Sequence, residues 1–343
     1  MKKVLIKFSF LLSLISIFSI LFLPNTLVFA DNSNKVYLGG DTIGLKLDTG
    51  VYIAGKYEVS TKEGKSSPWI RSDVEIGDKI EKIDYLVVNS VDDIKNCLYN
   101  TKKDSVSLTV NRKGKTIDTT INVCKTDNGS VSLGLYLKDK MLGVGTLTFI
   151  NPNNKTYASL GHGIIDNKIE YGNIDGELLY SNVESIKKGV PGSPGEKRAS
   201  LTNNHLGNIL TNSATGVYGI VSSKSFINKH RLVEVAEPNE VKTGHAYILT
   251  VVKEQEIAKF DIEIIEVVKQ NSRNIKGMKI KVTDENLLKT TGGIIQGMSG
   301  SPIIQNDKLV GAVSHVSIEN PTIGYGIFAK WMLDDANNIK INN

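Results

Sequence analysis

Short apolar segments punctuated by glycine recur along most of this chain, and they restrict it to a mainly β fold. After residue 126 they include 133–137, 143–149, 216–221, 246–252 and 260–268. Many short strands of this kind are typical of a barrel or a sandwich. Helices are indicated only at 90–100 and around 328–338. The 343 residues leave room for roughly two domains.

One stretch combines small residues with a serine: Gly297-Met298-Ser299-Gly300-Ser301-Pro302. Apolar runs flank it on both sides, so we expect a strand, a tight turn and a second strand. Glycine lets the backbone bend sharply and bring its N–H groups close to a substrate carbonyl. A serine hydroxyl beside such N–H groups is what acyl transfer requires. Ordinary hairpin loops have the same composition, so this stretch alone does not decide between the two.

A catalytic serine needs a base, and the chain contains five histidines: His162, His205, His230, His245 and His315. His162 lies between two glycines, which clear space around its imidazole. His205, His230 and His245 lie among polar loop residues and are expected at the surface. His315 follows the serine on a strand, where the alternation makes it a wall of a specificity pocket rather than a base.

The third member of a serine triad is an acid that orients the imidazole. The aspartates between the predicted base and the serine are Asp166, Asp175, Asp261 and Asp284. Asp166 is close to His162 in sequence, and Asp284 lies just upstream of the serine stretch, so the residues alone leave these two level. A serine–lysine dyad, for instance with Lys308, is chemically feasible, but it would leave Gly-His-Gly without a role.

Residues 35–125 are predicted to form a small β-rich module with one helix. A glycine-containing turn leads into a strand, Ser90 caps the helix, and 105–110 and 116–123 form a hairpin. This order resembles a PDZ domain, in which the first turn holds a peptide carboxylate and the peptide adds as a strand beside the helix. The resemblance implies a peptide-binding turn at Leu38, Gly39, Gly40, Asp41, Thr42 and Ile43.

The N-terminus sets the compartment. A basic start (Lys2, Lys3), an almost wholly apolar run at 4–23 and the small residues around Ala30 are typical of an export signal. The run approaches the ~20 residues that span a bilayer, so residues 1–30 are either a cleaved signal peptide or a retained membrane anchor.

A net charge of +5 gives no support for nucleic-acid binding. The two cysteines, Cys97 and Cys124, are compatible with one disulfide or with two free thiols, and the sequence does not decide between them.

The export segment, the PDZ-like module, "SLGHGIID" and "GMSGSP", in this order, resemble the SpoIVB peptidase family of sporulation signalling serine proteases. The resemblance spans essentially the whole chain. It implies a trypsin-like double β-barrel at 126–343, a serine endopeptidase activity and no cofactor or metal. It also implies His162 as the base, Ser299 as the nucleophile and Asp284 as the acid. The backbone N–H groups of Gly297 and Ser299 are expected to form the oxyanion hole.

The resemblance also implies a biological role. Family members are secreted by the forespore into the space between its two membranes. There they cleave themselves near the N-terminus and cut a membrane-bound regulator, which activates an intramembrane protease and a late sigma factor. The expected partners are therefore protein substrates and peptides bound by the PDZ module, with no nucleic acid.

Two other interpretations stay open. One is a catalytically inactive PDZ-containing binding or scaffold protein of the spore intermembrane space. The other is an HtrA-type quality-control protease, which normally carries its PDZ domain after the protease domain, whereas here the PDZ-like module comes first.

Overall fold

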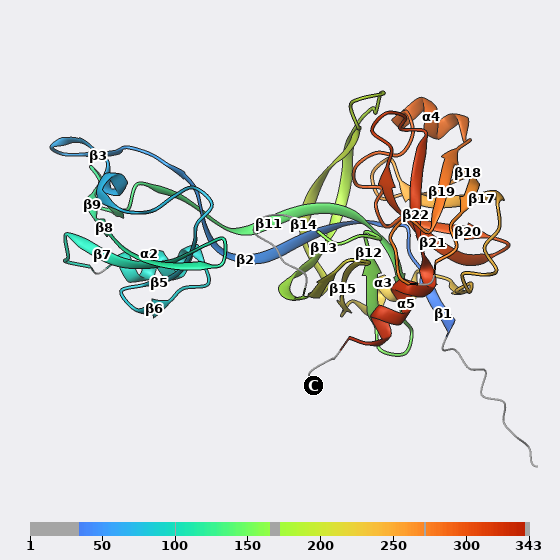
Figure 1. Cartoon of the computed structure of the whole chain (residues 1–343), viewed down its shortest axis with the longest axis horizontal. Helices are drawn as coiled ribbons and strands as arrows, with labels where there is room; N and C mark the ends of the chain where they lie inside the picture. Colours follow the sequence, from blue (N-terminus) through green and yellow to red (C-terminus); the bar gives the residue numbers. More distant parts are fainter. Residues whose placement is uncertain (1–33, 100, 165–171, 271, 340–343) are drawn as a thin grey trace, which may run out of the picture. The chain divides into compact units, whose positions relative to one another are not determined.

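The structure is a computed structural model that describes residues 34–99, 101–164, 172–270 and 272–339 (Figure 1). These residues form two β-barrels and a smaller α/β module. The expected export segment at 1–30 and the candidate acid Asp166 lie outside the described residues. Within the described ranges, no helix is long and apolar enough to cross a membrane.

Six antiparallel strands pair in a ring to form the first barrel. In ring order they are β2 (Thr42–Lys56), β13 (Gly172–Lys187), β14 (Glu196–Ser213), β15 (Gly216–Val221), β12 (Thr156–Ser159) and β11 (Leu135–Ile150). β11 pairs with β2 and thereby closes the ring. Alternate residues of β2, such as Ile43, Leu45 and Leu47, are buried in its core. The alternation of side chains along a strand therefore sets which face points inward.

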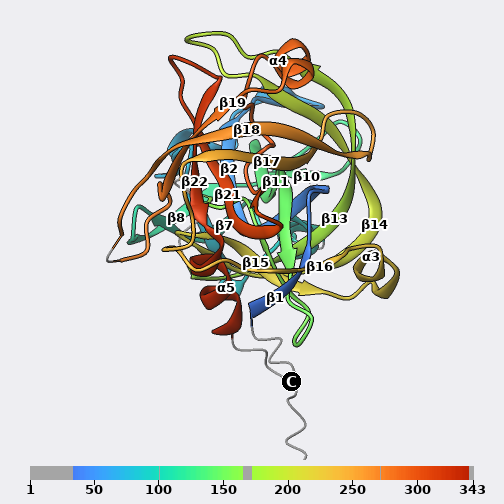
Figure 2. The same ribbon diagram turned by 90° about the vertical axis from the view of Figure 1, so that its right-hand side faces the viewer.

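The second barrel is also closed and six-stranded, as Figure 2 shows for the strands around β18. Its ring order is β17 (Gly244–Val251), β18 (Ile257–Val267), β19 (Met278–Val282), β22 (Ile323–Phe328), β21 (Lys308–Val316) and β20 (Pro302–Gln305). Ile248, Ile262 and Ile280 lie in its core and are fully buried. The predicted double β-barrel is therefore confirmed.

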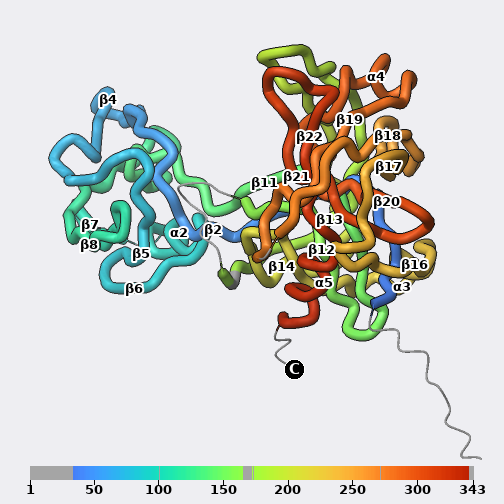
Figure 3. Tube along the Cα trace, turned by 45° about the vertical axis from the view of Figure 1, so that its right-hand side comes forward, coloured from blue at the N-terminus to red at the C-terminus, as the bar shows by residue number. Residues whose placement is uncertain are grey.

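A third apolar cluster joins strands of both barrels, and it includes Phe149 of β11 and Ile304 of β20. Two short strands, β1 (Lys35–Leu38) and β16 (Leu232–Glu234), pair beside it. The C-terminal helix α5 (Ala329–Asn337) packs on β12 and β21 and contributes Met332 and Leu333 to this cluster (Figure 3). Two shorter helices are α3 (Lys224–Asn228) and α4 (Glu285–Thr291).

The remaining elements form the PDZ module around one apolar core that includes Ile53, Ile80 and Leu108. Its elements, besides parts of β2 and β11, are β3 (Val59–Thr61), β4 (Gly64–Ser66), η2 (Pro68–Arg71), β5 (Lys79–Ile83), β6 (Leu86–Val87), α2 (Val91–Tyr99), β7 (Ser105–Arg112), β8 (Lys115–Asn122), β9 (Cys124–Lys125) and β10 (Val131–Ser132). Cys97 and Cys124 are free thiols, so no disulfide staples the module.

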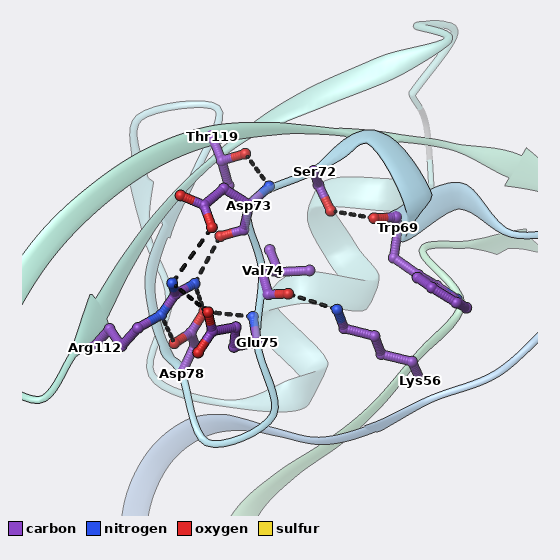
Figure 4. A network of polar contacts seen from close by, with 9 residues as sticks. All are labelled: Lys56, Trp69, Ser72, Asp73, Val74, Glu75, Asp78, Arg112 and Thr119. Carbon is purple, nitrogen blue, oxygen red and sulfur yellow. Dashed lines mark hydrogen bonds and ion pairs between the residues drawn. The ribbon is translucent and has the colours of Figure 1, made fainter.

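A charged cluster around Arg112 fixes the loop that precedes β5 (Figure 4). The guanidinium of Arg112 donates two hydrogen bonds to the buried carboxylate of Asp78, at 2.8 and 2.9 Å, and a third to Glu75 at 2.9 Å. Burial alone would raise the pKa of Asp78, but the bonds from Arg112 and the Glu75 N–H lower it overall. Bidentate pairs of this kind are among the stronger ion pairs, so this loop is held firmly on β7.

The boundary between the module and the first barrel differs from the expected one at residue 35. β2 is a single 15-residue strand. Its first half pairs with β13, and Val51 and Tyr52 in its second half pair with β5 of the module. Lys35–Leu38 and the first half of β2 therefore belong to the protease barrels, because their apolar side chains are buried there.

Candidate active site

Ser299 lies in a loop that runs from α4 to β20. Gly297 and Gly300 have positive φ angles of 91° and 92°, which glycine adopts without strain. Met298 N–H donates to the carbonyl of Ile295, and Gly300 N–H donates to that of Val313. By contrast, the N–H groups of Gly297 and Ser299 have no acceptor in the described part of the chain. Two free, neighbouring N–H groups are what an oxyanion hole requires.

The residues before this loop do not form the expected strand. Ile294 and Ile295 are buried, but their segment is irregular, and Ile294 N–H donates to the Pro321 carbonyl at 2.8 Å. This apolar run is buried because Ile294 and Ile295 pack into the core of the second barrel, and it does not form a strand.

Two threonines of β11 hold the serine loop on the first barrel. Thr146 donates its N–H to the Ser299 carbonyl at 2.9 Å and its hydroxyl to the Gly297 carbonyl at 2.8 Å. Thr148 donates its hydroxyl to the Gly300 carbonyl, also at 2.8 Å. Sequence reasoning missed both residues, because threonine is an ordinary strand residue. The three bonds make β11 the support of the nucleophile.

The loop that carries His162 follows β12 and is anchored on the same strand. Leu160 donates its N–H to the Thr146 carbonyl at 3.3 Å. Asn212 clamps the far side of the loop, since its side-chain amide exchanges two 2.8 Å hydrogen bonds with the N–H and carbonyl of Ile164. Asn212 is another positioning residue that the sequence analysis did not find.

The hydrogen bonding of His162 suits a general base. Its Nδ1 lies 2.9 Å from the Gly163 carbonyl. A carbonyl only accepts, so Nδ1 carries the proton and Nε2 keeps its lone pair. Burial lowers the pKa of His162, although the Gly163 carbonyl opposes this shift. The ring is therefore neutral near pH 7 and ready to take a proton.

The structure brings Ser299, His162 and His315 together. The Ser299 hydroxyl donates to the carbonyl of Ser314 at 3.5 Å, and the ring of the adjacent His315 lies 5.1 Å from that of His162. Burial is the main cause that lowers the pKa of His315 to about 4, and the charges of His162 and Lys276 add smaller contributions. His315 is thus neutral at pH 7, and its buried Nδ1 has no hydrogen-bond partner among the described residues.

The predicted acid Asp284 has a different environment. It is the N-cap of α4, where its carboxylate accepts from the N–H of Leu287 at 2.9 Å and of Asp261 at 3.4 Å. No hydrogen bond joins it to His162 among the described residues. Its role as the triad acid therefore rests on the family resemblance alone.

Lys308 is not suited to a serine–lysine dyad. Its Nζ lies 2.8 Å from Glu234 and 2.7 Å from Glu240. The hydrogen bonds that the amine donates to these two carboxylates raise the pKa of Lys308, so the amine is a cation and cannot act as a base.

The proposed PDZ turn at 38–43 is corrected by the structure. Gly39 and Gly40 donate their N–H groups to the carbonyls of Thr148 and Leu147 in the first barrel. Asp41 is buried and accepts from His230 Nε2 at 2.6 Å. These residues therefore support the protease barrels and are not free to bind a peptide carboxylate.

Another edge of the PDZ module has the features that peptide addition needs. The start of β11, from Leu135 to Lys138, pairs with β2 on one side. No strand among the described residues pairs with its other side. The helix α2 contacts β11, and Val91 N–H donates to the Asp139 carboxylate at 2.7 Å. Gly134, with φ of 67°, turns the chain into this strand.

Two six-stranded barrels with a serine, a histidine and free N–H groups where their loops meet define a serine peptidase of the trypsin-like class. The family model of the SpoIVB peptidase S55 matches residues 129–333, and that of the PDZ domain matches residues 44–123. The first match covers more than half of the chain, which therefore belongs to the SpoIVB peptidase S55 family.

Comparison with curated proteins finds no match. Among solved structures, the chain is similar to the inactive form of a serine-to-alanine mutant of Rv3671c from M. tuberculosis H37Rv. The sequence identity is 15% and the TM-score is 0.33, and the alignment covers 59% of this chain and 85% of that one. A similarity this low carries no argument about activity.

Proposed function

We propose that this serine peptidase cleaves itself near its N-terminus and also cuts a membrane-bound regulator. Cleavage of the regulator then triggers intramembrane proteolysis and the activation of a late sigma factor. Family membership supports the sporulation role. The observation that carries the chemistry is the pair of N–H groups at Gly297 and Ser299 that have no acceptor among the described residues, in the loop whose serine contacts Ser314, next to His315 and His162.

The mechanism follows from the positions of these groups. Ser299 attacks a peptide carbonyl while Nε2 of His162 takes the hydroxyl proton and later gives it to the leaving amine. The carbonyl oxygen becomes an oxyanion that accepts from the N–H groups of Gly297 and Ser299. In the free protein the Ser299 hydroxyl donates to Ser314, so it must rotate towards His162 before the attack.

The PDZ module supplies a second contact with protein partners. A peptide in extended form would add to the open edge of β11 at Leu135–Lys138, next to α2. Tyr136 on this strand is 59% exposed, which offers apolar surface to such a peptide. The module would thereby hold a substrate, or the N-terminal segment of the chain itself, near the protease.

The proposed location is outside the cytoplasm, in the space between the two forespore membranes. The apolar run at 4–23 supports export, either as a signal peptide or as an anchor.

The test incubates the full chain in mild detergent, wild type beside Ser299→Ala, with a fluorophosphonate probe. We expect the wild type to label and to release N-terminal fragments, and the mutant to do neither. Equal behaviour of the two proteins would contradict the proposal and favour the inactive binding or scaffold protein. Mass spectrometry of the labelled peptide locates the modified residue.

A further inference from the structure

Lys197, in β14, is a buried lysine without a carboxylate partner in the described part of the chain. Lys197 is only 5% exposed to solvent. Its Nζ donates to the hydroxyl of Thr250 at 2.8 Å and to that of Thr42 at 3.3 Å. These threonines come from the second and the first barrel. Burying a cation without a counter-charge destabilises the folded state, so the burial of Lys197 indicates a functional role.

The side chain of Lys197 lies directly behind the serine loop. A Cβ added at Gly297 would meet Cβ of Lys197 at 3.1 Å and its Cγ and Cδ at 3.2 Å. The backbone is joined as well: Lys197 N–H donates to the Gln296 carbonyl, and Gln296 N–H donates to the Gly195 carbonyl, both at 2.9 Å. The start of β14 therefore holds two consecutive residues of the serine loop. Its backbone hydrogen bonds fix Gln296, and the side chain of Lys197 packs against Gly297.

We infer that Lys197 is a positioning residue for the oxyanion hole, and that its buried amine stabilises the negative charge that forms there. The inference rests on the proposed function, since it requires an oxyanion. The alkyl chain packs against Gly297, and Thr42 and Thr250 hold the amine in place. A charge in a buried, poorly screened region acts over a longer distance than one at the surface.

The groups around the amine do not compete with this role. β2 presents the hydroxyl of Thr42, β17 presents that of Thr250, and the serine loop presents glycine. The nearby carboxylates are engaged elsewhere, Asp41 with His230 and Glu196 with Arg198. Burial lowers the pKa of Lys197 to about 7, so the amine gains or loses its charge in the pH range where a serine peptidase works.

The test measures the second-order rate of fluorophosphonate labelling for the full chain on both sides of pH 7. Lys197→Met keeps most of the alkyl chain and removes the charge. We expect labelling to fall roughly tenfold below pH 7, less than the loss of a direct oxyanion donor. The difference shrinks as the pH rises through about 7, because the wild-type amine is then neutral too.

The matched control is Arg198→Met, which removes an exposed positive charge one residue further along the strand. Its labelling rate is expected to equal that of the wild type at every pH. Equal rates for wild type and Lys197→Met overturn the inference and leave the peptidase function intact. A wild type that does not label overturns the proposed function itself.

A second variant covers the case in which Lys197→Met does not fold, as judged by its thermal unfolding. Thr250→Val removes the 2.8 Å acceptor of the amine and leaves the serine loop untouched. A reduced labelling rate with an altered pH profile supports the inference, and an unchanged profile overturns it.

Discussion

Two of the histidines, His162 and His230, differ in what their ring nitrogens contact. His230 is buried, and both of its nitrogens are engaged: Nδ1 with the Phe226 carbonyl at 2.8 Å and Nε2 with Asp41 at 2.6 Å. Among the described residues, only Gly163 engages a ring nitrogen of His162, at Nδ1. His230 has the carboxylate partner of a catalytic triad, whereas His162 has the serine nearby.

The difference teaches that an aspartate–histidine pair is not by itself a catalytic sign. A base needs a free nitrogen, and His230 has none. Burial alone would raise the pKa of Asp41, but the bond and charge of His230, with help from Lys229, lower it overall. This cluster ties the junction of β1 and β2 to the helix α3, so its role is to hold the first barrel together.

Replacing His162 gives the largest effect that the comparison predicts. His162→Ala removes the ring nitrogen that takes the proton of Ser299 in the proposed mechanism, and loss of a triad base costs up to about 10⁶-fold in turnover. We expect fluorophosphonate labelling to be abolished while the thermal unfolding temperature changes little. His205→Ala, at an exposed ring, is the control. Retained labelling in His162→Ala would mean that another group is the base.

Replacing His230 is expected to act on stability. His230→Ala leaves Asp41 buried without its main partner, which costs about 3–5 kcal/mol of unfolding free energy. Chemical denaturation measures this loss, and labelling per folded molecule should stay at the wild-type level. His245→Ala removes an exposed pair with Asp261, for which a cost of at most about 1 kcal/mol is expected. Similar losses in the two variants would contradict the structural role of the buried pair.

The same contrast shows what the sequence can predict. Glycine punctuation and strand alternation predicted a barrel or a sandwich, and the two glycine-flanked motifs predicted Ser299 and His162, because each of these signals is local. The double barrel was implied by the family resemblance. His230 was expected at the surface and is buried instead. Its partner Asp41 is 189 residues away, and a contact that distant leaves no local pattern.

The long strands β13 and β14 and the supports of the active site were missed for related reasons. β14 contains four asparagines and two serines and is only partly buried, so its alternation is weak. The hydroxyl of Thr146 reaches Gly297 across 151 residues of sequence, and Lys197 does so from another strand. Sequence patterns identify the groups that react, and the groups that orient them emerge only from tertiary packing.

The pH dependence of activity sharpens the comparison further. The base must be neutral to accept a proton, and burial lowers the pKa of His162 below its ordinary value of 6.5. Activity therefore rises with pH, and the midpoint of its acid limb is expected below 6.5. The rate of fluorophosphonate labelling against pH measures this midpoint. A midpoint at or above 6.5 would indicate that a carboxylate acts on the ring in solution.

The smallest expected effect concerns Asp284. Asparagine caps helices about as well as aspartate does, so Asp284→Asn keeps the bond from Leu287 N–H and removes only the charge. We expect it to label at nearly the wild-type rate, because the carboxylate does not contact His162. Asp284→Ala removes the cap and should cost about 1 kcal/mol of unfolding free energy. A fall of about 10⁴-fold in Asp284→Asn, with unchanged unfolding, would show instead that Asp284 orients the base as the family resemblance implies.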